Sequence, residues 1–121
     1  LSIAASYLTD GEIKAVDLDK LAVDVSRENF ALNNLENRIT VEEASLLTKE
    51  TKKYNVIVAN ILAHIIELML DDAYKLLEDG GYYIGIIKDK KDELLEKMLE
   101  RGFKLVEETS DNEWYSFVVT K

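Results

Sequence analysis

The sequence contains no cysteine, and its single histidine is His64. Without cysteine the chain forms neither a disulfide framework nor a thiolate metal site. A single histidine also argues against a multi-histidine metal centre and against a Ser-His-Asp triad elsewhere in the chain. We therefore expect no metal site. The absence of cysteine suits the reducing cytosol, so we predict a cytoplasmic protein.

Long apolar runs and excess positive charge are also missing. The uncharged, mostly apolar stretch at residues 56–66 is shorter than the roughly 20 residues that a membrane-spanning helix needs, so we expect no membrane partner. The formal charge is −9, from 24 acidic and 15 basic residues. Such a surface repels phosphate backbones, which disfavours direct nucleic-acid binding, and it attracts a basic peptide or a lysine-rich protein. The alternative is an acidic surface that only aids solubility.

What is present is the composition of one α/β domain. The 121 residues are 47% apolar and 32% charged, which suits a single globular domain over residues 1–121. Hydrophobic periodicity predicts alternating helices and strands. The predicted strands are residues 12–17, 38–43, 54–59, 82–87, 103–108 and 114–119. Helices are predicted at the start of the chain, over residues 20–33, from residue 62 to a Gly-Gly exit at 80–81, and before Gly102.

This alternation predicts a doubly wound, mostly parallel sheet with right-handed helical crossovers. The last two strands are joined by a short polar loop, so we expect them to form an antiparallel hairpin. In the helix over residues 20–33, we predict that the buried face carries Leu21, Ala22, Val25 and Leu32.

Ligands of such folds bind outside the carboxyl ends of the strands. Four residues follow predicted strand ends: Asp17, Ser45, Asn60 and Lys88. An acid at the end of the second strand of a nucleotide-binding unit accepts hydrogen bonds from ribose hydroxyls, and Asp17 fits that position. An acid before a helix also serves as a dipole-compensating cap, so both roles stay open.

Asn60 lies in VANILA, residues 58–63, between an apolar strand and a long apolar-periodic helix. A polar residue there either caps the helix or contacts a ligand, and a side chain at that strand end can do both. His64, four residues later, is expected to be a partly exposed helix residue. The charged run at residues 88–93 is expected to be a solvated helix start.

Several segments together resemble one family. They are LSIAA (1–5), AVDLDKLAV (15–23), RENFALNN (27–34), VIVANILA (56–63), LLEDGGYYIGII (76–87), RGFKLVEE (101–108) and NEW (112–114). In this order they resemble the S-adenosylmethionine-dependent methyltransferases of the PrmA type, which methylate amino groups of ribosomal protein L11. VDLD and DGG are generic to class I methyltransferases, whereas VANILA and GFKLVEE are more specific.

The resemblance implies a cofactor, S-adenosyl-L-methionine, and a ribosomal protein as substrate. It places Asp17 at the cofactor's ribose and Leu18 beside the adenine, and it places Ser45 and Leu46 in the loop that meets the adenine edge. Asn60 and Ile61 match the start of the family's NILA motif, beside the methionine end of the cofactor. Asn60 is also the expected catalytic residue, because a neutral carbonyl oxygen can orient an amine without protonating it.

The sequence departs from the family pattern at several points. Ser45 stands where the family usually has Asp, and Lys20 where it often has Pro at the first helical position. The family's glycine-rich turn, first strand and amino-terminal substrate-recognition domain have no counterpart in these residues. We expect that turn and strand to precede Leu1 in the intact protein, and we expect weak cofactor binding without them.

Three other functions remain open from the sequence. One is a methyltransferase of the same architecture with a different acceptor, and another is a non-catalytic domain that has lost cofactor binding, for which Ser45 is the best support. A nicotinamide-dependent reductase also uses an acid such as Asp17. The terminal hairpin and VANILA argue against the reductase.

Overall fold

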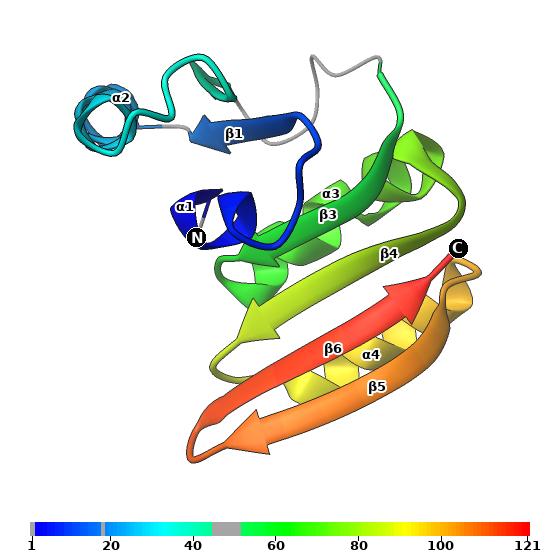
Figure 1. The fold of residues 1–121 in the computed structure, drawn as a ribbon. Coiled ribbons are helices and arrows are strands. Elements are labelled where there is room, and N and C mark those ends of the chain that lie inside the picture. Colours follow the sequence, from blue (N-terminus) through cyan, green and yellow to red (C-terminus); the bar gives the residue numbers. More distant parts are fainter. Residues whose placement is uncertain (1, 18, 45–51) are drawn as a thin grey trace. The chain divides into compact units, whose positions relative to one another are not determined.

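The computed structural model describes residues 2–17, 19–44 and 52–121. The chain divides into two compact units, Leu1–Lys49 and Glu50–Lys121, and each is described by itself. Figure 1 shows the helices and strands of both units.

The first unit is a small α/β unit with a two-stranded sheet. It contains α1 (Ser2–Ser6), β1 (Ile13–Asp17), α2 (Lys20–Leu32) and β2 (Ile39–Glu43). β1 and β2 pair in parallel, and Asp17 lies opposite Glu43 at the carboxyl edge. Parallel neighbours need a crossover connection, which α2 supplies. The predicted β-α-β order of this region is confirmed.

The ends of α2 follow from the local sequence. The N-cap residue is Asp19, whose carboxylate accepts a hydrogen bond from the Leu21 N–H at 2.9 Å. The helix ends at Leu32, and Asn34 adopts a left-handed φ of 56°. Asparagine tolerates this conformation, so the predicted exit at residues 33–34 is confirmed.

The predicted buried face of α2 is wrong. The buried side chains are Val23 and Phe30, which pack against Ile39 and Val41 of β2. Of the predicted face, Leu21, Val25 and Leu32 are exposed, and Ala22 is half-buried. The helix carries two apolar stripes, and the one with the large aromatic ring covers the sheet because it buries more apolar area.

The second unit is a four-stranded mixed sheet with two helices. Its elements are β3 (Tyr54–Asn60), α3 (Ala63–Leu76), β4 (Leu77–Ile87), α4 (Lys91–Glu100), β5 (Lys104–Asp111) and β6 (Trp114–Thr120). The strand order is β3-β4-β6-β5. β3 and β4 are parallel, whereas β6 is antiparallel to both β4 and β5. The predicted terminal hairpin is confirmed, and its turn contains Asn112 with a left-handed φ of 57°.

One face of this sheet carries the core of the second unit. α3 and α4 both lie behind the sheet in the view of Figure 1. The side chains buried in this unit come from both helices and from alternate positions of the strands, as period-two strands require. The largest of them are Ile66, Leu70, Leu77, Tyr83, Ile87, Met98, Phe117 and Val119.

β4 begins earlier than predicted. The sequence predicts a helix exit at Gly80 and Gly81, but α3 ends at Leu76 and β4 starts directly at Leu77. Gly80 has a φ of 78°, and an added Cβ on Gly81 would lie 2.9 Å from the Asn55 carbonyl oxygen. The two glycines therefore bend a strand that continues through them, and the register between β3 and β4 shifts at this point.

Two ion pairs join α3 to α4 on the outside of the core. Lys97 Nζ lies 2.7 Å from Glu67 Oε1, and Arg101 Nε lies 3.1 Å from Asp71 Oδ1. The hydrogen bond that Lys97 donates lowers the pKa of the Glu67 carboxyl and raises that of the Lys97 ammonium. The two acids are four residues apart on α3, and the two bases are four residues apart on α4. The ion pairs therefore lie one helical turn apart along the contact between α3 and α4.

Candidate functional site

Asn60 is the last residue of β3, at the carboxyl edge of the second sheet. It lies opposite Ile86 of β4, so Lys88 follows at the same edge of the neighbouring parallel strand. The Asn60 side chain is exposed and makes no hydrogen bond to any residue that the structure describes. Its amide therefore has both a donor and an acceptor available for a ligand.

The structure does not support a capping role for Asn60. The N-cap residue of α3 is Leu62, which has an extended backbone and no side-chain cap hydrogen bond. Asn60 lies two positions before the cap residue, because it still pairs within the sheet and Ile61 forms the bend between them. Of the two roles expected for Asn60, capping is wrong and ligand contact stays a prediction.

Asp17 is the last residue of β1, and its side chain is exposed at the carboxyl edge of the first sheet. Its Oδ1 accepts a hydrogen bond from the Asp19 N–H at 2.9 Å, and its carbonyl oxygen accepts one from the Ala44 N–H. Asp19, not Asp17, is the helix cap. The Asp17 carboxylate is therefore oriented by one backbone bond and keeps acceptor capacity for hydroxyl groups.

The other predicted cofactor residues divide into two sets. Ile61 is 40% exposed directly after Asn60, so an apolar surface adjoins the Asn60 amide. Leu18, Ser45 and Leu46 lie outside the described residues. Asp17 and Asn60 belong to different units, and each is placed only within its own sheet.

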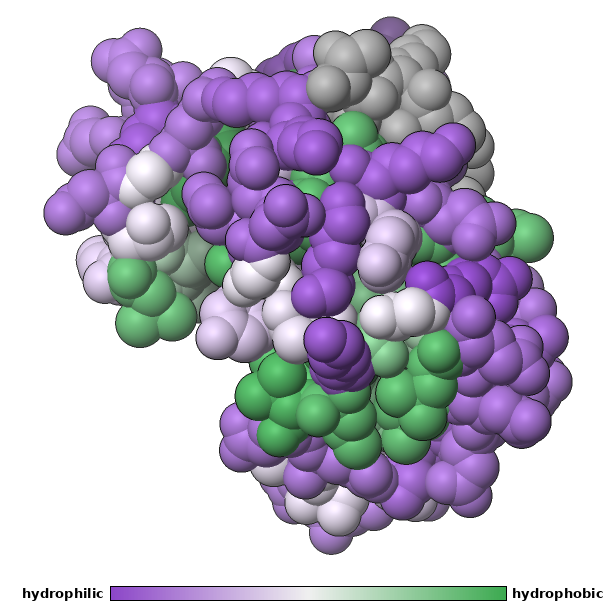
Figure 2. All heavy atoms as spheres, turned by 90° about the vertical axis from the view of Figure 1, so that its right-hand side faces the viewer, coloured by the Kyte–Doolittle hydropathy of each residue, from purple (hydrophilic) through white to green (hydrophobic). Residues whose placement is uncertain are grey.

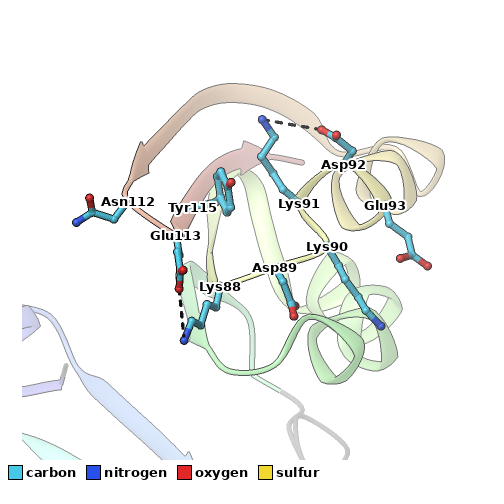
Figure 3. A pocket seen from close by; sticks show the side chains of 9 residues that line it. All are labelled: Lys88, Asp89, Lys90, Lys91, Asp92, Glu93, Asn112, Glu113 and Tyr115. Atoms are coloured by element: carbon cyan, nitrogen blue, oxygen red, sulfur yellow. Dashed lines mark ion pairs between the residues drawn. The ribbon is translucent and has the colours of Figure 1, made fainter.

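A charged groove of about 650 Å³ lies in the second unit, beyond the carboxyl end of β4. Its floor is the segment that follows β4, one wall is the start of α4, and the other wall is the end of the β5–β6 hairpin (Figure 3). We call it the β4 groove. Its lining residues are Lys88, Asp89, Lys90, Lys91, Asp92, Glu93, Asn112, Glu113 and Tyr115.

Lys91 joins the two walls of the β4 groove. Its ammonium pairs with Glu108 of β5 and lies 5.4 Å from the centre of the Tyr115 ring on β6. The hydrogen bond to Glu108 raises the pKa of Lys91, so the ammonium stays charged at neutral pH. This side chain therefore connects the hairpin with the start of α4.

A second, smaller cavity adjoins the groove on the side of α3. It has a volume of about 30 Å³, and its lining includes Ala63 and His64 at the start of α3. Lys90 and Glu93 line both cavities. The start of α3, three residues after Asn60, thus lines a cavity that shares Lys90 and Glu93 with the β4 groove.

Sequence reasoning missed the hairpin side of this groove. Lys88 was identified as a strand-end residue, but Asn112, Glu113 and Tyr115 carry no local signal that places them beside it. They reach the groove only because β6 pairs antiparallel with β4, with Tyr115 opposite Ile87. Tertiary pairing, and not sequence spacing, brings these residues together.

Two kinds of feature are absent from the described part of the chain. None of its helices combines the length and the apolar character needed to cross a membrane. Within the same ranges, no group of three or more histidine, cysteine, aspartate or glutamate side chains is arranged to hold a metal ion.

Solved structures with the same fold include several methyltransferases. A ribosomal protein L11 methylase from Lactobacillus delbrueckii subsp. bulgaricus is 26% identical with a TM-score of 0.93, and the match covers 98% of this chain and 62% of that one. A methyltransferase from Pyrococcus furiosus, 16% identical with a TM-score of 0.85 over 98% of this chain and 67% of that one, shares the fold. The α/β methyltransferase fold with a mixed sheet is therefore established.

The curated relatives carry one description. A ribosomal protein L11 methyltransferase from Staphylococcus carnosus is 50% identical, and one from Staphylococcus saprophyticus is 48% identical, each over the whole of this chain. The chain spans 39% of the length of these relatives. The family model described as "Ribosomal protein L11 methyltransferase (PrmA)" matches residues 1–121. The chain therefore belongs to the PrmA family of ribosomal protein L11 methyltransferases.

Proposed function

We propose that this chain forms part of the catalytic domain of an S-adenosylmethionine-dependent methyltransferase that acts on amino groups of a ribosomal protein. The observation that carries this proposal is Asn60, exposed and unpartnered among the described residues at the carboxyl edge of the second sheet. Relatives that are 45–50% identical are described as ribosomal protein L11 methyltransferases, which supports L11 as the acceptor. Lysine side chains and the N-terminal amine are the amino groups we propose.

The residues present fit the cofactor. The Asp17 carboxylate is held by the Asp19 N–H and keeps lone pairs for the two hydroxyls of a ribose. Ile61 offers exposed apolar surface next to the Asn60 amide. Leu18, Ser45 and Leu46 complete the proposed cofactor contacts, although they lie outside the described residues.

Asn60 would orient the acceptor amine. When bound, S-adenosylmethionine supplies a methyl carbon on a sulfonium sulfur, which is displaced as a sulfide when the amine nitrogen bonds to that carbon. The Asn60 carbonyl oxygen can accept one N–H of the amine and align its lone pair, while the released proton passes to water. An aspartate at this position would instead stabilise the protonated amine, which has no lone pair to react.

Calorimetry with S-adenosylhomocysteine tests the cofactor site. It should be carried out on the protein expressed from its full reading frame. We expect binding, and we expect Asp17→Asn to weaken it by about tenfold or more, because the Asn oxygen keeps the bond to Asp19 but the second ribose acceptor is lost. Asp10→Asn, an exposed change in the preceding turn, is the matched control. No heat of binding from the unsubstituted protein would contradict the proposal.

A further inference from the structure

We propose that the β4 groove binds the lysine-bearing segment of the protein acceptor and delivers its amine toward Asn60. This inference rests on the proposed function and names where its substrate lies. Three observations carry it: the position of the groove, its charges and the way its walls are fixed.

The groove lies at the edge where the chemistry is proposed. Because β3 and β4 are parallel, their carboxyl ends meet at one edge, with Asn60 opposite Ile86 and the groove floor beginning two residues later at Lys88. A separate, smaller cavity at the start of α3 shares Lys90 and Glu93 with the groove. The groove and the residues that follow Asn60 therefore lie at the same edge of the second sheet.

The charges of the groove suit an amine. Four carboxylates line it against three ammonium groups. Lys88 Nζ lies 3.7 Å from Glu113 Oε2, and Lys91 pairs with Asp92 (Figure 3). These pairs leave two carboxylates, Asp89 and Glu93, with one ammonium, that of Lys90. Asp89 makes no ion pair or hydrogen bond through its side chain with any other residue in the described ranges. A lysine of the acceptor, which is positively charged at neutral pH, offers this carboxylate its counter-ion.

The surrounding charge favours the same partner. The chain carries a formal charge of −9, so a basic segment is attracted and a phosphate backbone is repelled. Figure 2 draws the face on the right-hand side of Figure 1, opposite to the carboxyl end of β4, and hydrophilic side chains cover much of it. An extended basic peptide thus meets a charged groove, and electrostatic steering contributes to its association rate.

The groove is also held open. The Lys91 ammonium clamps the hairpin wall through Glu108 and Tyr115, so the acceptor segment enters a groove whose two walls are already connected. A volume of about 650 Å³ lies in the range of sites that bury a ligand, which is ample for one lysine side chain and its neighbours. Preformed walls reduce the ordering that binding requires.

The groove and Asn60 are proposed to act on different protonation states of the acceptor amine. Carboxylates such as Asp89 favour the charged ammonium and so serve binding, whereas methyl transfer needs the neutral amine. Asn60 provides a neutral amide at the reacting end. We therefore expect the groove to govern the KM for the acceptor, and Asn60 to govern kcat.

The test is steady-state kinetics of the protein expressed from its full reading frame, with the ribosomal protein acceptor. The variant Asp89→Lys/Glu93→Lys should raise the KM for the acceptor by about tenfold or more, with kcat and S-adenosylhomocysteine affinity unchanged. The increase should shrink as salt is added. Glu96→Lys/Glu100→Lys, two exposed charge reversals on α4 outside the groove lining, is the matched control and should leave KM unchanged.

The outcomes separate this inference from the proposed function. An unsubstituted protein that binds the cofactor but transfers no methyl group to the protein acceptor overturns both. A working unsubstituted protein with an unchanged KM in Asp89→Lys/Glu93→Lys overturns the groove alone. An equal rise in KM for Glu96→Lys/Glu100→Lys also overturns it, because the effect is then one of net charge and not of the groove. Unchanged cofactor affinity in Asp89→Lys/Glu93→Lys shows that its fold is intact.

Discussion

Asn60 stands opposite Ile86 in the parallel register of β3 and β4. This pairing keeps Asn60 within the sheet, two residues before the N-cap of α3, and leaves its amide unpartnered among the described residues. The side chain thus contributes no helix cap to stability. Because ligands of such folds bind outside the carboxyl ends of the strands, we propose that this amide contacts a ligand.

We predict that Asn60→Ala lowers the turnover number by about 10²-fold, because the acceptor amine loses its alignment. The free energy of unfolding should change by less than about 0.5 kcal/mol, as for surface positions without a structural role. Methyl-transfer kinetics and urea denaturation measure the two effects. Asn55→Ala, an exposed change in the same strand, should alter neither. A stability loss of about 1 kcal/mol with normal turnover would restore the capping role.

Tyr83 gives a prediction about stability. Its ring is fully buried, and its hydroxyl has no hydrogen-bond partner in the part of the chain that the structure describes. Tyr83→Phe should therefore leave the free energy of unfolding unchanged or raise it by up to about 1 kcal/mol, because an unpaired polar group is removed from the core. Chemical denaturation tests this. A loss of more than about 1 kcal/mol would mean that the hydroxyl is bonded in the intact protein.

The same residue predicts a pH effect. Burial raises the pKa of the Tyr83 hydroxyl above its ordinary value of 10.0. In the unfolded chain the group ionises near pH 10, so above that pH its ionisation favours unfolding and stability falls. Tyr83→Phe should reduce this alkaline loss. Denaturation midpoints of both proteins at a series of pH values from neutral to alkaline measure it, and parallel curves would contradict the burial argument.

The glycines of β4 provide a matched pair. An added Cβ on Gly81 would lie 2.9 Å from two backbone oxygens, those of Asn55 and Glu78, whereas on Gly85 the nearest atom would be Met98 Cε at 3.5 Å. Backbone atoms cannot move aside cheaply, so Gly81→Ala should destabilise the protein by about 1–3 kcal/mol. Gly85→Ala should change stability by less than about 1 kcal/mol. Equal denaturation midpoints for the two variants would contradict this local geometry.

The ion pair between α3 and α4 predicts a loss of stability in acid. The hydrogen bond from Lys97 lowers the pKa of Glu67, so the stabilisation is present above the unfolded-state value and is lost as pH falls through the folded value. The same hydrogen bond raises the pKa of Lys97, so the contribution of Lys97 to stability is lost only at strongly alkaline pH. Glu67→Gln should reduce the fall in melting temperature between neutral pH and about pH 3. Glu96→Gln, an exposed change on α4, is the control. If this variant reduces the acid fall in melting temperature equally, the Glu67–Lys97 ion pair is not its cause.

The sequence predicted the order and type of the elements well, because helix and strand periods differ and the helix ends carry clear signals. Asn34 and Gly102, for example, both adopt the positive φ that ends a helix. The buried face of α2 was wrong because two apolar stripes compete and only packing against β2 decides between Val25 and Phe30. The same limit applies to Asn60, since the cap position depends on how far β3 pairs with β4.

The site was predictable only in part. Strand-end reasoning identified Asp17 at the edge of the first sheet, and Asn60 and Lys88 at the edge of the second, since parallel neighbours in a sheet end at the same edge. The β4 groove was not predictable, because its second wall comes from Glu113 and Tyr115, which arrive through antiparallel pairing about 25 residues later in the chain.

Mass spectrometry of the acceptor tests the central claim most directly. Ribosomal protein L11 is incubated with S-adenosylmethionine and the protein expressed from its full reading frame, and its peptides are then mapped. The account predicts added methyl groups on amine nitrogens of L11, and their near-complete loss when Asn60→Ala replaces the unsubstituted protein. Unmodified L11 alongside measurable S-adenosylhomocysteine binding would contradict the assigned substrate. Full methylation by the Asn60→Ala variant would contradict the assigned role of Asn60.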